Sequence, residues 1–272
     1  MNSATPPVLA LGDVRFVYRN GLQALDGVTF DVPPGQVVAV VGPSGCGKST
    51  LLAIIAGLVK ATSGSLEWNI PEVEPGADTN HRLSLLFQKD TVLPWRTVER
   101  NVEFGLENLG IRKAQRKKRV DDLLEVGELG DFRKSYPIAL SGGMRRRLGL
   151  LMVMAVRPRV LLLDEPFAAV DEPTRVGLHE YVLKIVYEFG TSVVIVTHDL
   201  GEAITLGDTV HALSSRPGRV VASYQIPFGH DRDVYELRLE NAYQDVYKNI
   251  WAETWSEKMK ERAVRGEAPS IH

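Results

Sequence analysis

Nine consecutive residues form the clearest chemical motif in the sequence. They are Gly42-Pro43-Ser44-Gly45-Cys46-Gly47-Lys48-Ser49-Thr50 and match the pattern G-x-x-x-x-G-K-[ST]. The glycines let such a loop turn tightly, so that successive backbone N–H groups converge on one anion at the start of the following helix. Lys48 is then expected to reach the β- and γ-phosphates, and Ser49 to place its hydroxyl on Mg²⁺. The motif predicts a site for a nucleoside triphosphate with Mg²⁺.

Two adjacent acids, Asp164 and Glu165, follow the apolar residues 160–163, which have the composition of a strand buried in a parallel sheet. Two carboxylates at the end of such a strand are costly unless they bind a cation or take part in proton transfer. In a chain with a phosphate-binding loop, Asp164 is predicted to be a Mg²⁺ ligand. Glu165 is predicted to orient and deprotonate an attacking water.

His198 follows a second apolar segment of the same kind, residues 192–196. A lone histidine at the end of a strand is more often structural than catalytic. This one, however, ends what is expected to be the strand next to residues 160–163. That position would let its imidazole reach the γ-phosphate.

A second anion site is indicated by Ser141, Gly142 and Gly143, which precede a long helical stretch. Serine is a good N-cap, and two glycines leave the first amides of the helix open to a ligand. Tyr18 is a further candidate: its ring would stack on a nucleotide base or lie on a sheet surface, and spacing alone favours neither.

The elements that must position these residues are readable from periodicity. Residues 37–41 predict a buried strand before the phosphate-binding loop, and residues 51–56 a helix start after it. Residues 14–18 and 24–32 predict an antiparallel sheet beside the nucleotide site. Further strands are predicted at residues 64–68, 83–87, 210–213 and 220–226.

Composition narrows the class of protein. The chain has 272 residues, of which 44% are hydrophobic and 24% charged, with a formal net charge of −2. These values suit a globular protein and argue against nucleic acid as the main partner. The single cysteine, Cys46, fits a reducing compartment. Residues 1–11 lack a signal-peptide pattern, and no apolar run approaches the ~18 to 20 residues of a membrane span. We therefore expect any membrane association to be peripheral.

Two segments of the sequence are each open to two interpretations. Six of the eight residues 112–119 are basic. This run would either bind phospholipid or nucleic acid or form the solvated face of a helix. The acidic residues just after it favour the solvated face. Beyond residue 231, apolar residues recur at helical spacing, and this amphipathic tail would pack on its own domain or dock on a partner, the former being favoured. Its apolar residues are Tyr243, Val246, Tyr247, Ile250, Trp251, Trp255 and Met259.

Taken in order, the motifs resemble those of the ATPase subunit of ABC transporters, over roughly residues 8–225. They are Walker A (residues 42–49), Gln88, residues 140–143, Walker B (residues 160–165), Asp171 and His198. The sequence looks more closely like the group that serves nitrate, sulfonate and taurine importers. The residues that carry this closer likeness are 86–90, 93–98, Met144, 164–167 and 216–218.

The resemblance implies an α/β fold of the P-loop NTPase class: a RecA-like core with an antiparallel β subdomain and an inserted α-helical subdomain. The expected ABC ATPase domain is residues 1–230, with the helical subdomain at about 89–156. Residues 231–272 would be a C-terminal amphipathic helical extension. One departure from the family's pattern is the sequence Ala168-Ala169-Val170-Asp171, where Ser-Ala-Leu-Asp is usual.

The resemblance also implies a composite site. In a head-to-tail dimer, each ATP would contact residues 42–50, Gln88, Asp164, Glu165 and His198 of one subunit and residues 141–143 of the other, with Tyr18 stacked on adenine. Asp171 would lie in the loop that crosses between the two sites. The expected catalytic residues are Glu165, His198 and Gln88, and the expected Mg²⁺ ligands are Ser49, Gln88 and Asp164.

The function implied is that of the ATP-binding and ATP-hydrolysing subunit of an ABC importer for a small solute. It would lie at the cytoplasmic face of the membrane, as a homodimer or with a homologous ATPase. Gln88 and residues 93–98 would meet a separate integral membrane permease, with Trp95 as an anchor, and an extracytoplasmic solute-binding protein would act indirectly. The alternatives are a stand-alone ATPase of a lipid or efflux ABC system and an ABC ATPase outside transport.

Overall fold

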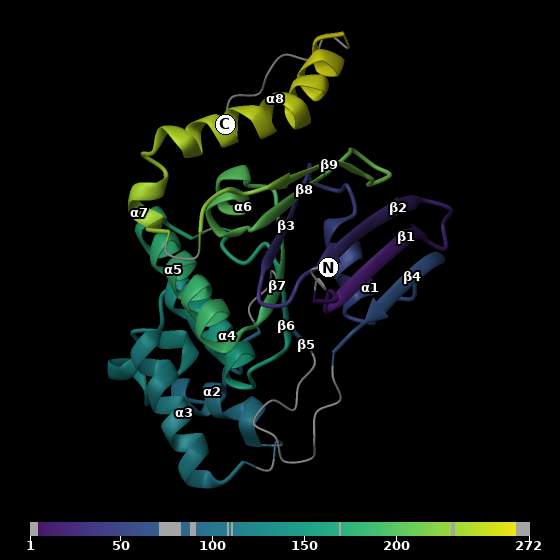
Figure 1. The fold of residues 1–272 in the computed structure, drawn as a ribbon. Coiled ribbons are helices and arrows are strands. Elements are labelled where there is room, and N and C mark those ends of the chain that lie inside the picture. The colour runs from purple at the N-terminus through teal and green to yellow at the C-terminus, as the bar shows by residue number, and fades with distance from the viewer. Residues whose placement is uncertain are drawn as a thin grey trace.

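The strands lie in two sheets in the computed structural model, which describes residues 5–70, 83–87, 91–107, 109, 111–168, 170–229 and 232–264. The smaller sheet is antiparallel, has the order β2-β1-β4, and lies at one side of the molecule (Figure 1). Its strands are β1 (Leu9–Val17), β2 (Gln23–Val32) and β4 (Ser63–Trp68). The predicted antiparallel sheet is confirmed, and β4 is its third strand.

The larger sheet has six strands in the order β5-β6-β7-β3-β8-β9. They are β3 (Val37–Val41), β5 (Leu83–Leu86), β6 (Val160–Asp164), β7 (Ser192–Thr197), β8 (Thr209–Leu213) and β9 (Val220–Gln225). All neighbours are parallel except β8 and β9. In register, Val41 pairs with Thr197, and Asp164 pairs with Val196. The loops after β3, β6 and β7 therefore leave the sheet at one edge, where ligands of such sheets bind.

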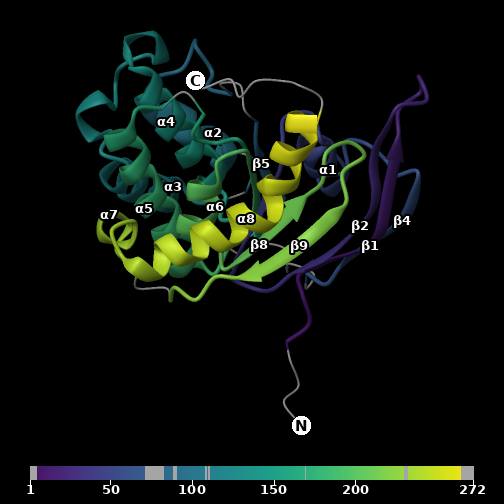
Figure 2. The same ribbon diagram turned by 90° about the horizontal axis from the view of Figure 1, so that it is seen from above.

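Helices cover both faces of this sheet and extend beyond one end of it. In chain order they are α1 (Lys48–Ile55), α2 (Val98–Glu107), α3 (Lys113–Val126), α4 (Gly142–Ala155), α5 (Glu172–Phe189), α6 (Leu200–Leu206), α7 (Val234–Leu237) and α8 (Asn241–Val264), with 3₁₀ turns at Gly130–Phe132 and Pro137–Ala139. Helices α2, α3 and α4 contact one another beyond β5, while α8 lies across α6 and β9 (Figures 1 and 2). The limits of the predicted subdomains at 89–156 and 231–272 stay predictions.

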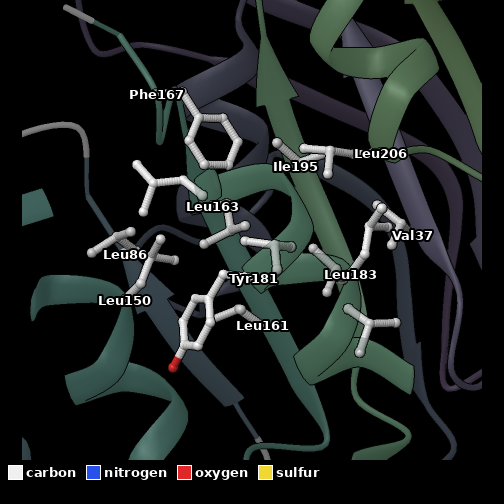
Figure 3. Close-up of a cluster of buried hydrophobic side chains, with 14 of the residues drawn as sticks. Val37, Leu86, Leu150, Leu161, Leu163, Phe167, Tyr181, Leu183, Ile195 and Leu206 are labelled. Carbon is white, nitrogen blue, oxygen red and sulfur yellow. The ribbon is translucent and has the colours of Figure 1, made fainter. Parts of the chain in front are cut away.

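The core has two parts, because alternate residues of each central strand face opposite sides of the sheet. Val37, Ala39 and Val41 belong to one buried cluster, and Val38 and Val40 to the other, which includes side chains of α1. Figure 3 shows the first cluster, in which strand side chains meet side chains of α4 and α5. Its labelled members include Leu150, Leu161, Leu163, Tyr181, Leu183 and Ile195. The phosphate-binding loop thus starts from a strand buried on both faces.

The tail packs on its own chain over the part whose side chains are described. Tyr243 and Ile250 of α8 are 4% and 1% exposed, while Trp251 is 42% exposed. Self-packing, the favoured interpretation, is confirmed for this half of α8; the side chains of Trp255 and Met259 lie outside the described residues.

The basic run lies mostly on α3, where Lys117 and Lys118 pair with Asp121 and Asp122, each at 2.8 Å. The solvated-face interpretation therefore holds for these lysines. Arg119 differs: it is 8% exposed and donates a hydrogen bond to the Ala155 carbonyl at 3.2 Å. None of the helices in the described ranges combines the length and the apolar character needed to cross a membrane.

Candidate active site

The phosphate-binding loop joins the end of β3 to the start of α1. Gly45 and Gly47 have φ angles of 77° and 110°, a region that side-chain-bearing residues rarely adopt. A Cβ atom on Gly47 would also lie 2.8 Å from the carbonyl oxygen of Ala24. Both observations explain why glycine occupies these positions, and the loop places the first amides of α1 at the edge of the sheet.

Lys48 folds back across this loop. Its side-chain Nζ donates hydrogen bonds to the carbonyl oxygens of Gly42, at 2.8 Å, and Pro43, at 3.2 Å, and the residue is 5% exposed. Both acceptors are neutral, so the buried ammonium keeps its full charge for an anion in the loop. This arrangement fits the predicted phosphate contact.

Ser49, in the first turn of α1, and Asp164, at the end of β6, are in contact. The Ser49 Oγ donates to Oδ1 of Asp164 at 3.1 Å. Burial, the largest cause, and the charge of Glu165 raise the pKa of Asp164, while the hydrogen bond from Ser49 acts to lower it. A partly buried carboxylate beside a hydroxyl is an oxygen donor set that suits Mg²⁺, and a bound cation would relieve the cost of its burial. These two residues would hold the ion; Gln88, the third predicted ligand, lies outside the described residues.

Glu165 and His198 are brought together by the neighbouring strands β6 and β7. The imidazole Nδ1 of His198 lies 3.3 Å from Oε1 of Glu165. The backbone of Glu165 has a φ of 42°, an uncommon conformation for a residue with a side chain. Its amide donates to the Val196 carbonyl at 2.9 Å, which holds the strained residue against β7. Glu165 and His198, both predicted to be catalytic, are therefore in contact.

Tyr18 lies beside the end of the phosphate-binding motif. Its hydroxyl and the Thr50 Oγ1 are 2.7 Å apart, and its ring packs edge-on against Phe16 with the centroids 4.9 Å apart. The residue is 42% exposed, so part of the ring is open to solvent. Of the two interpretations, the position beside the loop is compatible with stacking on a base, which stays a prediction.

Ser141 caps α4 as predicted. Its Oγ accepts a hydrogen bond from the Met144 amide at 3.2 Å. A Cβ atom on Gly142 would meet no other atom within 4 Å, so the start of this helix is open. Both ribbon views place α4 apart from α1, with β5 between them (Figures 1 and 2). Within one chain, the capped helix start and the phosphate-binding loop are therefore separate.

Asp171 is exposed and directly precedes α5. Two turn-like hydrogen bonds shape the backbone that leads to it from Glu165: the amide of Ala168 donates to Glu165 and that of Val170 to Phe167, each at 3.3 Å. The loop after β6 therefore carries Glu165 at its start and Asp171 at its end.

Two arginines of the site were missed by the sequence reasoning. Arg146 is 6% exposed, and its guanidinium donates to the carbonyls of Phe87 at 2.8 Å, Glu165 at 3.2 Å and Pro166. It ties α4 to the ends of β5 and β6. Local sequence did not separate it from its neighbours, because the residues four positions after Arg145, Arg146 and Arg147 are all buried.

The second is Arg216, in the turn between β8 and β9. Its Nε and Nη2 donate to the Gly45 carbonyl at 2.9 and 2.8 Å. This contact connects the phosphate-binding loop to the turn between β8 and β9. In the sequence, Arg216 was notable only as part of an Arg-Pro-Gly turn. A turn motif does not predict which residues its side chains contact.

Together, the fold and the site define a P-loop nucleoside triphosphatase: a phosphate-binding loop, a hydroxyl–carboxylate pair and an acid next to a histidine gather at one edge of a mainly parallel sheet. The profile of the family described as ABC transporter matches residues 25–168. The "Taurine import ATP-binding protein TauB" of Jannaschia sp. (strain CCS1) is 38% identical over 238 residues, which are 86% of this chain and 88% of that protein. The chain belongs to the ABC transporter family and is one of its ATPases.

A further relative and two solved structures support the same family assignment. The protein of the same name from Rhizobium johnstonii is 42% identical over 212 residues, 78% of this chain and 79% of that one. A solved structure described as "Dimeric Structure of MJ0796, a Bacterial ABC Transporter Cassette" matches with a TM-score of 0.70 and 29% identity, over 81% of this chain and all of that one. The same cassette bound to ADP and Pi matches with a TM-score of 0.69. These likenesses confirm the predicted fold class.

Proposed function

We propose that this protein is the ATP-binding and ATP-hydrolysing subunit of an ABC importer that drives uptake of a small solute of the nitrate, sulfonate or taurine kind through a separate permease. The observation that carries the proposal is the contact between Glu165 and His198 beside the phosphate-binding loop. An acid and a histidine at that place fit hydrolysis of a bound triphosphate rather than binding alone.

Each residue at the carboxyl ends of the parallel strands has its own role in the proposed hydrolysis. Lys48 binds the β- and γ-phosphates, and Tyr18 stacks on the base. Glu165 orients a water and takes its proton, while His198 contacts the γ-phosphate and holds the carboxylate. When bound, Mg²⁺ neutralises charge on the phosphate oxygens, and Ser49, Asp164 and Gln88 are its proposed ligands.

A second copy of the chain, or a homologous ATPase, completes each site. The start of α4 carries open amides and the positive end of a helix, which bind anions. Because α4 and α1 lie apart within one chain, with β5 between them (Figures 1 and 2), we assign residues 141–143 to the ATP held by the other subunit. The dimeric structure of the MJ0796 cassette supports this assembly.

The permease is proposed to dock on a groove of about 410 Å³ between β5, α2 and α4. Two of the aromatic residues that line it, Phe87 and Phe104, are 46% and 41% exposed. Its lining residues are Ser84, Leu85, Phe87, Thr91, Phe104, Gly105, Met152, Val153 and Val156. An apolar groove with exposed aromatics suits an amphipathic helix of a partner.

The loop that carries Trp95 is held to α2, which lines the groove. Asn101 is fully buried; its Oδ1 accepts from the Leu93 amide at 2.7 Å, and its Nδ2 donates to the Leu93 and Arg96 carbonyls at 3.1 and 3.0 Å. Trp95 itself is 71% exposed. A rigid loop with an exposed tryptophan suits an anchor for the permease, and it would keep the protein at the cytoplasmic face of the membrane.

The solute class rests on the relatives, whose names state taurine import. The test is ATP-dependent uptake in proteoliposomes that contain the protein and its natural permease, with the extracytoplasmic binding protein outside. Taurine, other sulfonates and nitrate are offered in parallel. Uptake of one of them that needs ATP and is abolished by Glu165→Gln supports the proposal, with Glu67→Gln, an exposed carboxylate on β4, as the matched control. ATP-dependent release in place of uptake would contradict it.

A further inference from the structure

The C-terminal segment after β9 contacts the two helices that follow the loops of the active site. Figures 1 and 2 show α7 beside α5 and α8 over α6, and both pairs of helices are in contact. Helix α5 begins directly after Asp171, and α6 begins two residues after His198. The tail therefore packs on the two helices that follow the functional loops.

The first contact is a chain of three charged side chains. Arg238, just after α7, pairs with Oε1 of Glu172. The other oxygen of Glu172 lies 3.1 Å from Nη1 of Arg175. Nη2 of Arg175 in turn donates to the Val170 carbonyl at 2.8 Å. Because Val170 directly precedes Asp171, the chain of contacts connects the tail to the backbone of the loop that carries Asp171.

Arg175 also reaches the loop that carries His198. Its Nη1 lies 3.8 Å from Oδ2 of Asp199. The other oxygen of Asp199 caps α6, accepting from the amides of Gly201 at 2.7 Å and Glu202 at 3.2 Å. One guanidinium therefore lies between the two loops, and its ion pair with Glu172 is one of the contacts that hold it there.

The second contact is direct. The Tyr243 hydroxyl donates to the Gly201 carbonyl at 3.2 Å, in the first turn of α6. Tyr243 is 4% exposed, and burial is the main cause that raises its pKa. Its hydroxyl thus stays protonated and able to donate at neutral pH.

The tail is rigid where it makes these contacts. Val234, Leu237 and Ile250 are 1%, 3% and 1% exposed, and the Gln244 side chain donates to the Arg238 carbonyl at 2.9 Å. Arg238 therefore leaves a fixed backbone. Its ion pair, in contrast, is open to water, since the Glu172 side chain is 53% exposed. Exposed pairs of this kind contribute little to stability, so loss of the Arg238 side chain is expected to leave the fold in place.

We propose that the C-terminal segment is a positioning element of the ATPase site. Arg238 acts through Glu172 and Arg175 on the loop that carries Asp171, and Tyr243 acts on the start of α6 after His198. This inference rests on the proposed function, in which both loops serve hydrolysis. The family profile matches residues 25–168, so the segment lies outside the matched residues.

The test compares steady-state ATP hydrolysis by the complex with its permease, well below the melting temperature. Arg238→Ala is expected to lower kcat by roughly three- to tenfold, to leave the KM for ATP within about twofold, and to change the melting temperature little. Arg238→Lys is expected to recover part of the rate. The matched control is Tyr235→Ala, which removes a residue of α7 that is 60% exposed.

A double-mutant cycle separates positioning from structure. If Arg238 acts through Glu172, Arg238→Ala adds no further loss of kcat to Glu172→Gln. Tyr243→Phe, which keeps the ring, is expected to lower kcat with a small change in melting temperature. The inference is wrong if Arg238→Ala matches the Tyr235→Ala control, if the two losses add in full, or if kcat falls only in step with stability. If the unaltered complex fails to hydrolyse ATP, or Glu165→Gln leaves its rate unchanged, the proposed function itself fails.

Discussion

His198 and Glu165 come from the ends of two neighbouring parallel strands, and their side chains are in contact, with Nδ1 and Oε1 3.3 Å apart. The strands impose this proximity, because Asp164 pairs with Val196 in register. Glu165 comes one residue after Asp164, and His198 comes two residues after Val196. In the proposed mechanism, the imidazole holds the Glu165 carboxylate in place as the base that acts on a water beside the γ-phosphate.

Glu165→Gln is expected to lower kcat for ATP hydrolysis by roughly 10²- to 10⁴-fold, since the amide accepts no proton from water. ATP binding is expected to persist, because Lys48 and Ser49 are unchanged. Phosphate release and ATP titration calorimetry measure the two effects, with Glu67→Gln as the control. Hydrolysis at an undiminished rate would show that Glu165 is not the base.

Asp164→Asn is expected to raise the melting temperature of the nucleotide-free protein at pH 7, on the order of 2 °C, and to remove the further rise that Mg²⁺ and ATP produce. Burial, the largest cause, raises the pKa of Asp164 above its usual 3.8. The folded state therefore binds this proton more tightly than the unfolded state does. The stability that protonated Asp164 contributes is fully present below pH 3.8. It is lost as the pH rises through the raised pKa.

The gain from Asp164→Asn should consequently shrink as the pH is lowered towards the acid range. Differential scanning fluorimetry across a pH series, with and without Mg²⁺ and ATP, measures it. Equal melting of the two proteins at neutral pH would contradict the assigned cost of burial. An undiminished response of the variant to Mg²⁺ would contradict the assigned ligand.

Arg146→Ala is expected to destabilise the fold by about 2 to 4 kcal/mol, because it leaves the carbonyls of Phe87, Glu165 and Pro166 without their buried donor. Urea unfolding measures the loss. Arg159→Ala, at an exposed position just before β6, is the control and is expected to stay within about 0.5 kcal/mol of the unaltered protein. Similar midpoints for both variants would show that Arg146 does not join α4 to the strand ends.

Gly142→Asp is expected to leave stability unchanged or slightly raised and to abolish hydrolysis. A Cβ atom there meets no atom within 4 Å, and a carboxylate suits the first turn of a helix. The same charge repels the triphosphate of the other subunit. Gly142→Ala is the neutral control for the added Cβ. Normal hydrolysis by Gly142→Asp would exclude the start of α4 from the ATP site.

Much of the fold was predictable, because the strands of the parallel sheet are buried on both faces and have continuous apolar sequences such as 37–41. The site residues at the strand ends were predictable for the same reason, since parallel strands bring their carboxyl ends to one edge. Arg146 was not distinguished from Arg145 and Arg147, because three consecutive arginines on a helix face three directions and only packing selects the buried one. The contacts of Arg238 and Tyr243 depend on where the tail folds back, which local sequence does not determine.

The central claim, that one chain holds two separate halves of an ATP site, is tested most directly by the molar mass of the Glu165→Gln variant. Light scattering with saturating ATP and Mg²⁺ is expected to give twice the chain mass of 30.1 kDa, and the double variant with Gly142→Asp is expected to stay at the mass of one chain. If Glu165→Gln binds ATP and remains at the mass of one chain, completion of the site by a second copy of this chain is contradicted. If Gly142→Asp leaves the dimer intact, the composite site itself is contradicted.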